Sequence, residues 1–162
     1  MSPRLEDAMA ALHGTDSRAV HEAIVFIAEV AYFNIRGIES DIVPEANEER
    51  LSPGELLTLK RALLDFVERD PFGSDAGSAI WGLSKFCDRE MIKTYQVWLK
   101  RYVDHLSPEA FALGQTLVSL HNLGERAITG GSFSADEFGK NFSDAVAYLN
   151  RQQDRPTKES NP

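Results

Sequence analysis

Apolar residues recur at helical spacing along almost the whole chain, and no stretch shows the alternation at period two that marks a half-buried strand. The most restrictive segment is residues 17–36, where apolar side chains occupy most of the circumference of the expected helix. A helix that is apolar on nearly all sides is normally buried at the centre of a fold. The sequence therefore predicts an all-α protein packed around this segment.

Six further helices are expected, over about residues 3–12, 53–68, 75–87, 89–106, 108–123 and 135–151. Ser52 with Glu55, and Ser134 with Glu137, have the spacing of a capping box, in which a hydroxyl and a carboxylate bind the free amides of a first helical turn. These two serines are expected to begin the third and the seventh helix. Asp88 is expected to cap the fifth.

The spacing of the helices suggests a repeat. Helix pairs begin near Asp75 and Ser107, which are about 32 residues apart. Antiparallel pairs that recur at about 35–45 residues are typical of HEAT-like α-solenoids. The repeats are too divergent to align by eye, so two architectures stay open: a HEAT-like α-solenoid and an irregular helical bundle. About seven helices in antiparallel pairs are expected in either case.

Length and polarity predict the domain organisation. A chain of 162 residues most simply forms one domain, which we expect over residues 1–151. Residues 152–162 are polar and contain proline, a composition typical of a disordered tail. The sequence shows neither the pattern of a secretory signal nor a run of about 20 apolar residues. We therefore expect a soluble, cytoplasmic protein that does not enter a membrane.

Residues that usually carry chemistry are few and scattered. Cys87 is the only cysteine, which excludes an intramolecular disulfide, and we expect it to be a buried structural residue. The four histidines form no metal-binding motif, and the sequence contains no Glu-x-x-His, phosphate-binding loop or dinucleotide-binding fingerprint. We expect no metal, no cofactor and no catalytic residue, although a small all-α enzyme with an unrecognised site stays an alternative.

Two further groups of residues have both a structural and a functional interpretation. Gly124 is expected to supply a left-handed C-cap, and His121 to interact with the last carbonyls of the sixth helix rather than with a ligand. Trp98 shares a helical face with Tyr95, which favours a place in the core. Trp81 lies one step off the apolar face of its helix, so it could reach the surface and anchor a partner.

Negative charge is concentrated in one part of the chain. The net charge is −8, and residues 37–75 alone contain ten acidic and four basic side chains. Without a concentrated positive surface, direct binding to nucleic acid is not expected. The acidic segment is either a solvated loop that promotes solubility or a negative surface that attracts a basic protein.

Residues 78–128 resemble the paired helices of small HEAT-like immunity proteins from bacterial toxin–immunity systems. The similarity is carried by "WGLSKFCD", which has the pattern W-x-L-x-K-F-x-D, and by "LVSLHNLGE", which has the pattern L-x-x-L-x-x-L-G-E. The resemblance implies a non-enzymatic cytoplasmic protein that binds a cognate toxin and blocks its active site. Many such toxins are nucleases, and an acidic inhibitor can occupy their basic cleft as a phosphate mimic.

The charge pattern, rather than a family motif, selects the expected contacts with such a partner. They are the acidic residues Glu39, Asp41, Glu45, Glu48, Glu49, Asp70 and Asp75, with Phe72 or Trp81 as apolar anchors. Two alternatives stay open beside this hypothesis: a helical adaptor or regulator unrelated to toxins, and the small enzyme named above.

Overall fold

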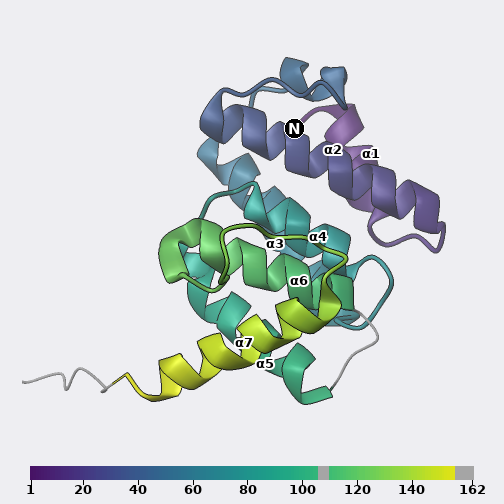
Figure 1. Ribbon diagram of the computed structural model, residues 1–162. Helices are drawn as coiled ribbons and strands as arrows, with labels where there is room; N and C mark the ends of the chain where they lie inside the picture. Colours follow the sequence, from purple (N-terminus) through teal and green to yellow (C-terminus); the bar gives the residue numbers. More distant parts are fainter. Residues whose placement is uncertain (106–109, 156–162) are drawn as a thin grey trace, which may run out of the picture. The chain divides into compact units, whose positions relative to one another are not determined.

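The computed structural model describes residues 1–105 and 110–155, and within these ranges it consists of helices joined by loops, with no strand (Figure 1). The all-α prediction is confirmed, and a regular solenoid stays a prediction. The α-helices are α1 (Pro3–Ala11), α2 (Ser17–Arg36), α3 (Pro53–Arg69), α4 (Ala76–Ser84), α5 (Ile92–His105), α6 (Ala110–Leu120) and α7 (Phe138–Gln153). Three short helical turns are η1 (Pro44–Glu48), η2 (Arg89–Met91) and η3 (His121–Glu125).

The chain divides into two compact units, Met1–Arg89 and Glu90–Pro162, which we call unit 1 and unit 2. The expectation of one domain over residues 1–151 stays a prediction, because the compactness of each unit does not tell whether the two unfold together. Most of the expected tail, residues 156–162, lies outside the described residues. Its first two residues, 152 and 153, belong to α7.

Unit 1 is organised around α2, which packs against α1, α3 and α4. The helix begins after Asp16, whose side chain accepts the amides of Arg18 and Ala19, and ends at Gly37 in the left-handed conformation (φ 67°). Its buried residues, from Val20 to Ala31, lie on more than one face. This agrees with the expected central helix.

The capping box at the start of α3 is confirmed. Ser52 Oγ accepts the amide of Glu55, and the Glu55 carboxylate accepts the amide of Ser52. The same carboxylate lies 2.6 Å from the amino group of Met1. The hydrogen bond from that amino group, followed by those from Ser52, lowers the pKa of Glu55 to about 2.

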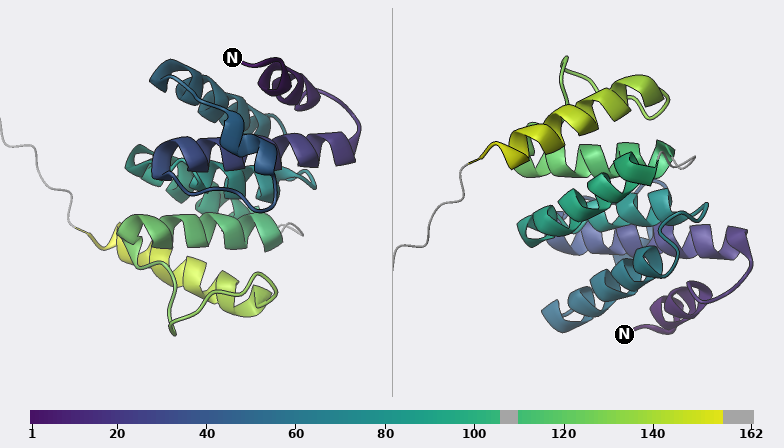
Figure 2. Two further views of the ribbon diagram at one scale, coloured as in Figure 1. Left: turned by 90° about the horizontal axis from the view of Figure 1, so that it is seen from above. Right: turned by 90° about the horizontal axis from the view of Figure 1, so that it is seen from below.

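Unit 2 contains α5, α6 and α7, each of which packs against the other two. Figure 2 shows α6 (green) and α7 (yellow) side by side. Trp98 and Tyr95 of α5 are buried with their rings 5.9 Å apart, edge to face. The predicted core position of Trp98 is confirmed. Aromatic residues therefore fill much of the core of this unit.

Two predictions about the end of α4 are wrong. The fourth helix ends at Ser84 instead of continuing to Cys87, because the chain turns there and Cys87 adopts a left-handed conformation (φ 50°). That turn leaves the cysteine exposed rather than buried. Asp88 forms an ion pair with Lys60, and α5 is preceded by the tighter turn η2. The expected cap at Asp88 stays a prediction.

The predicted capping box at Ser134 and Glu137 is also wrong. The helix α7 begins four residues after Ser134, and the residue before it, Glu137, makes no side-chain cap. The Ser134 carbonyl instead accepts a hydrogen bond from the buried Asn141 side chain. Phe138 is 53% exposed and stands at the first position of this helix.

The connection after α6 turns sharply, as Gly124 predicts. Gly124 is left-handed (φ 92°), and so is Arg126 (φ 47°). His121 is a structural residue, but its Nδ1 accepts the amide of Ile128 across the loop instead of binding the last helical carbonyls. Across the described ranges, no helix is both long and apolar enough to span a membrane.

Candidate protein-binding surface

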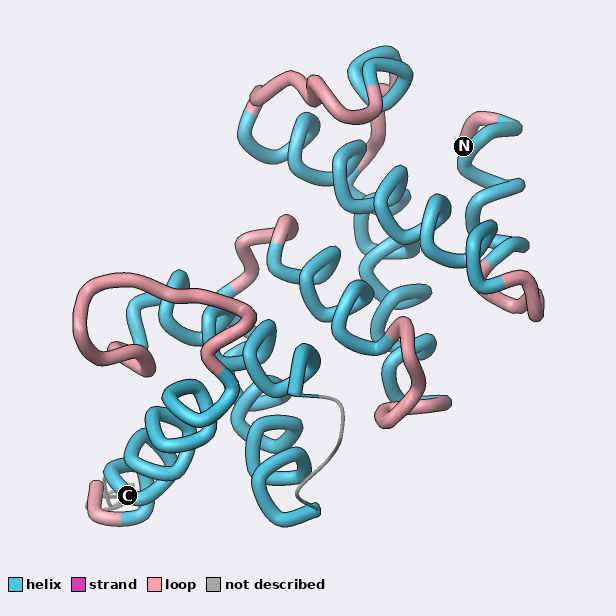
Figure 3. Tube along the Cα trace, turned by 45° about the vertical axis from the view of Figure 1, so that its right-hand side comes forward, coloured by secondary structure: helices cyan, strands magenta, loops and turns pink. Residues whose placement is uncertain are grey.

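Residues 37–52 form the segment between α2 and α3 (Figure 3). Hydrogen bonds, mainly from uncharged side chains, fix this segment. The amide side chain of Asn47 binds the backbone of Ser40 twice, accepting its N–H at 2.7 Å and donating to its carbonyl at 3.1 Å. Ser40 is itself buried, and its hydroxyl accepts the amide of Val43. The first half of the segment is therefore closed on itself.

Asn34 attaches the second half of the segment to α2. Its Nδ2 donates to the carbonyl of Glu49 at 3.0 Å, and its Oδ1 accepts the amide of Leu51 at 2.9 Å. Ala46, at the centre of η1, is completely buried. Asn34 and Asn47 were not among the predicted residues. The only sequence feature that could have indicated the anchoring role of Asn34 is the presence of an amide side chain on a strongly apolar helix.

This anchored segment presents aliphatic side chains to solvent. Ile38 is 46% exposed and Ile42 is 74% exposed, while Ile35, at the end of α2, is 38% exposed. Of the nine large hydrophobic side chains exposed among the described residues, three thus fall within eight residues of sequence. Clustered exposed apolar groups are more informative than isolated ones, because they are typical of surfaces that bind another molecule.

Carboxylates alternate with these isoleucines. Glu39, Asp41 and Glu45 are exposed, and the described residues offer none of them an ion-pair partner. We call the combined set the acidic–aliphatic surface. It consists of Ile35, Ile38, Glu39, Asp41, Ile42 and Glu45.

Two other predicted contacts on the same segment are engaged within the protein. Glu48 pairs with Arg4 of α1 at 2.9 Å, an exposed ion pair of small energetic value. Glu49 is only 8% exposed, and its carboxylate accepts the hydroxyl of Ser2 at 2.7 Å. Glu49 therefore differs from the expected exposed contact, because its side chain joins the N-terminal segment to the loop.

The remaining predicted contacts lie on other elements. Asp70, Phe72 and Asp75 belong to the connection between α3 and α4, where Asp75 accepts the hydroxyl of Ser17 at 3.3 Å. Trp81 of α4 is half-buried, and the ammonium group of Lys85 lies 4.9 Å from its ring. The structure thus separates the predicted contacts into two groups on different segments of unit 1.

Unit 1, which contains the acidic–aliphatic surface, is more negative than unit 2. Residues 1–89 contain 16 acidic and 9 basic side chains, a net charge of −7, whereas residues 90–162 contain 9 and 8, a net charge of −1. A negative unit of this kind attracts basic partners and raises the rate at which they associate. The acidic–aliphatic surface therefore belongs to the unit that has the stronger field.

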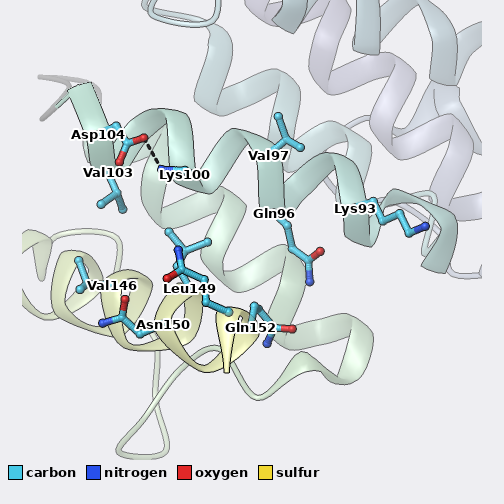
Figure 4. A pocket seen from close by; sticks show the side chains of 11 residues that line it. Lys93, Gln96, Val97, Lys100, Val103, Asp104, Val146, Leu149, Asn150 and Gln152 are labelled. Carbon is cyan, nitrogen blue, oxygen red and sulfur yellow. Dashed lines mark hydrogen bonds and ion pairs between the residues drawn. The ribbon is translucent and has the colours of Figure 1, made fainter. Parts of the chain in front are cut away.

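Unit 2 offers a groove of different character, between α5 and α7, with a volume of about 590 Å³ (Figure 4). Aliphatic side chains of both helices and amide groups line it, and Lys100 pairs with Asp104 at its edge. The lining residues are Lys93, Gln96, Val97, Lys100, Val103, Asp104, Val146, Leu149, Asn150, Gln152 and Gln153. This groove is suited to an apolar segment, and its residues were not predicted from the sequence.

Within residues 1–105 and 110–155, no group of three His, Cys, Asp or Glu side chains is placed to bind a metal ion. Comparisons with family models, curated proteins and solved structures found no match to the chain. The functional argument therefore rests on the surfaces described above.

Proposed function

We propose that this protein is a non-enzymatic binding protein that acts in the cytoplasm and attaches to a basic protein partner through the acidic–aliphatic surface. The observation that carries the proposal is that exposed isoleucines are interspersed with carboxylates that have no ion-pair partner among the described residues, on a backbone fixed by hydrogen bonds. A fixed backbone lowers the conformational entropy that binding must overcome.

The two kinds of side chain have different roles in this proposal. The carboxylates of Glu39, Asp41 and Glu45 attract the partner and orient it during encounter, which increases the association rate. Ile38 and Ile42 are buried on binding and slow dissociation, because removing apolar area from water contributes about 25 cal/mol per Å². Such a surface fits a partner that combines Lys or Arg side chains with an apolar patch.

The specific form of the proposal is an immunity protein, and the partner is then a toxin whose basic cleft is blocked. Support comes from the resemblance of residues 78–128 to immunity proteins and from the acidic charge of unit 1. A helical adaptor would use the same surface for an unrelated basic protein. The two differ in genetic context, since an immunity gene directly follows the gene of its toxin.

The experiment measures binding of the purified chain to the toxin encoded by the preceding gene, together with protection of cells that express that toxin. Glu39→Lys combined with Glu45→Lys is expected to reduce the association rate at least tenfold and to flatten its dependence on salt. Ile42→Ser is expected to increase the dissociation rate about tenfold or more.

Matched controls come from unit 1 itself. Asp7→Lys with Asp65→Lys changes the net charge equally on exposed residues of α1 and α3. Leu57→Ser removes an aliphatic side chain of α3 that is 40% exposed. Equal effects of test and control variants would remove the acidic–aliphatic surface from the mechanism. Binding that leaves the toxin active would contradict the immunity function while leaving an adaptor function intact.

A further inference from the structure

Three arginines of unit 2 line one concavity, which has a volume of about 560 Å³. Arg126 comes from the turn after α6, and Arg151 and Arg155 come from the C-terminal end of α7 and the residues that follow it. The wall of this concavity is completed by Gly124, Glu125, Gln152 and Asp154. Residues about 25 positions apart are thus assembled into a site that sequence inspection does not reveal.

A hydrogen bond joins the two segments that carry these arginines, and one of the arginines has an uncommon backbone conformation. Arg151 donates a hydrogen bond from its guanidinium group to the carbonyl of Arg126 at 3.2 Å. Arg126 itself has a left-handed backbone conformation (φ 47°, ψ 43°), which is uncommon for a residue with a side chain. Uncommon backbone conformations are found more often at functional sites than elsewhere.

One of the two acids in the concavity is already neutralised. Glu125 accepts the hydroxyl of Tyr148 at 3.1 Å and lies 3.8 Å from Arg155, and its side chain is only 15% exposed. Burial, followed by the charge of Glu125, raises the pKa of Tyr148 to about 12, so this hydroxyl stays a donor at neutral pH. The hydroxyl is held in turn by Gln96, which donates to it at 2.8 Å.

The positive charge left over determines the class of ligand. The guanidinium groups of Arg126 and Arg151 have no carboxylate partner among the described residues. Glu125 pairs with Arg155, which leaves Asp154 as the remaining acid among the residues that line the concavity. Guanidinium groups bind carboxylate and phosphate oxygens through parallel hydrogen bonds. We propose that Arg126, Arg151 and Arg155 form a binding site for a small, multiply charged oxyanion.

The test is an NMR titration of the ¹⁵N-labelled chain with pyrophosphate and, separately, with citrate, each compared with sodium chloride at equal ionic strength. Saturable shifts of the arginine Nε–H signals and of Gly124 are expected with at least one probe. Pyrophosphate binding alone identifies a phosphate site, and citrate binding alone identifies a carboxylate site. Equal shifts with chloride would overturn the proposal.

Variants separate binding from a purely structural role. Arg126→Gln and Arg151→Gln are each expected to weaken binding about tenfold. Asp154→Asn is expected to strengthen it a few-fold, because a repelling carboxylate is removed. Arg36→Gln, at the end of α2, makes the same charge change outside the site and is expected to have no effect.

Arginines near a helix C-terminus also interact favourably with the helix dipole. If that is their only role, the Arg151→Gln variant loses thermal stability. Pyrophosphate and citrate then either bind all variants as they bind the unmodified protein or bind none of them. Circular dichroism melting of the same samples distinguishes this result from the proposal.

Discussion

Two loops of this protein, one in each unit, use their carboxylates in opposite ways. In unit 1 the carboxylates of the acidic–aliphatic surface are exposed and unpaired within the described residues. In unit 2 Asp144 is 5% exposed and accepts hydrogen bonds from Thr129 and Lys140. Net charge therefore does not by itself show which carboxylates are available to bind another protein. A carboxylate is available only where the fold places no hydrogen-bond donor or cation of the same chain against it.

The reason for the difference lies in how each loop is fixed. The loop before α7 is attached through the carboxylate of Asp144, which binds both the amide and the hydroxyl of Thr129. The segment between α2 and α3 is attached mainly through the uncharged side chains of Asn34 and Asn47. Because amides satisfy most of its backbone, the carboxylates Glu39, Asp41 and Glu45 remain exposed.

The largest expected effect is at Asp144. Asp144→Asn removes the charge that binds Lys140 and disturbs the bonds to Thr129, so the free energy of unfolding should fall by about 2–3 kcal/mol. Urea denaturation measures this loss. Glu45→Gln is the matched control in unit 1. A loss of similar size for Glu45 would contradict the contrast between the units.

The effect of Asp144 should depend on pH. Burial pushes the pKa of Asp144 upward, but the hydrogen bonds from Thr129 and Lys140 outweigh it and hold the pKa below the ordinary value of 3.8. A carboxyl whose pKa is lower in the folded state stabilises the fold above the ordinary pKa and loses this contribution as the pH falls through the folded value. The difference between the protein and Asp144→Asn should therefore shrink below about pH 3.8.

Asn34→Ala should cost about 1–2 kcal/mol, because the amide of Leu51 loses its acceptor and the carbonyl of Glu49 keeps only the donor Arg50. Hydrogen exchange should accelerate in residues 38–51 more than elsewhere in unit 1. Thr58→Ala, at an exposed position of α3, is the control. Unchanged exchange in the segment would show that Asn34 does not anchor it.

Tyr148→Phe should cost about 1 kcal/mol, because Gln96 and Glu125 lose the hydroxyl that joins them. In the unmodified protein, absorbance titration should show an ionisation near pH 12 that belongs to Tyr148, and this contribution should be absent from the variant. Ionisation of every tyrosine near the ordinary value of 10 would contradict the buried network.

The smallest effect is expected for the acidic–aliphatic surface. Glu39→Gln, Asp41→Gln and Glu45→Gln should each change the free energy of unfolding by less than about 0.5 kcal/mol. The combined variant should be slightly more stable at low salt, because repulsion within a negative unit decreases. A clear loss of stability would mean that these carboxylates support the fold and are not free for a partner.

Local signals in the sequence were enough for part of the fold. The bounds of α2 follow from Asp16 and Gly37, and the start of α3 follows from the capping box at Ser52, because the residues that form each cap are neighbours in sequence. The same pattern failed at Ser134, where the hydroxyl accepts the amide of Asp136 and the carbonyl accepts the side chain of Asn141. A capping pattern therefore predicts a helix start only where the serine hydroxyl does not bind an amide in a local turn instead.

The candidate site was predicted only in outline. Charge pattern located the segment, but helical periodicity assigned Ile35 to the core, and it gave no reason to expect Ile42 at 74% exposure. In the sequence, Glu49 looks like the neighbouring acidic residues, and only the structure shows that its carboxylate binds Ser2. Exposure of an apolar residue, and pairing of a charged one, depend on contacts between segments distant in sequence, which a single sequence does not show.

The most direct test of the binding surface is hydrogen–deuterium exchange of the protein with and without the toxin encoded by the preceding gene. The proposed function predicts that protection on binding concentrates in residues 35–45, and that Glu39→Lys with Glu45→Lys abolishes this protection at equal toxin concentration. Protection confined to the groove between α5 and α7, with residues 35–45 unchanged, would contradict it.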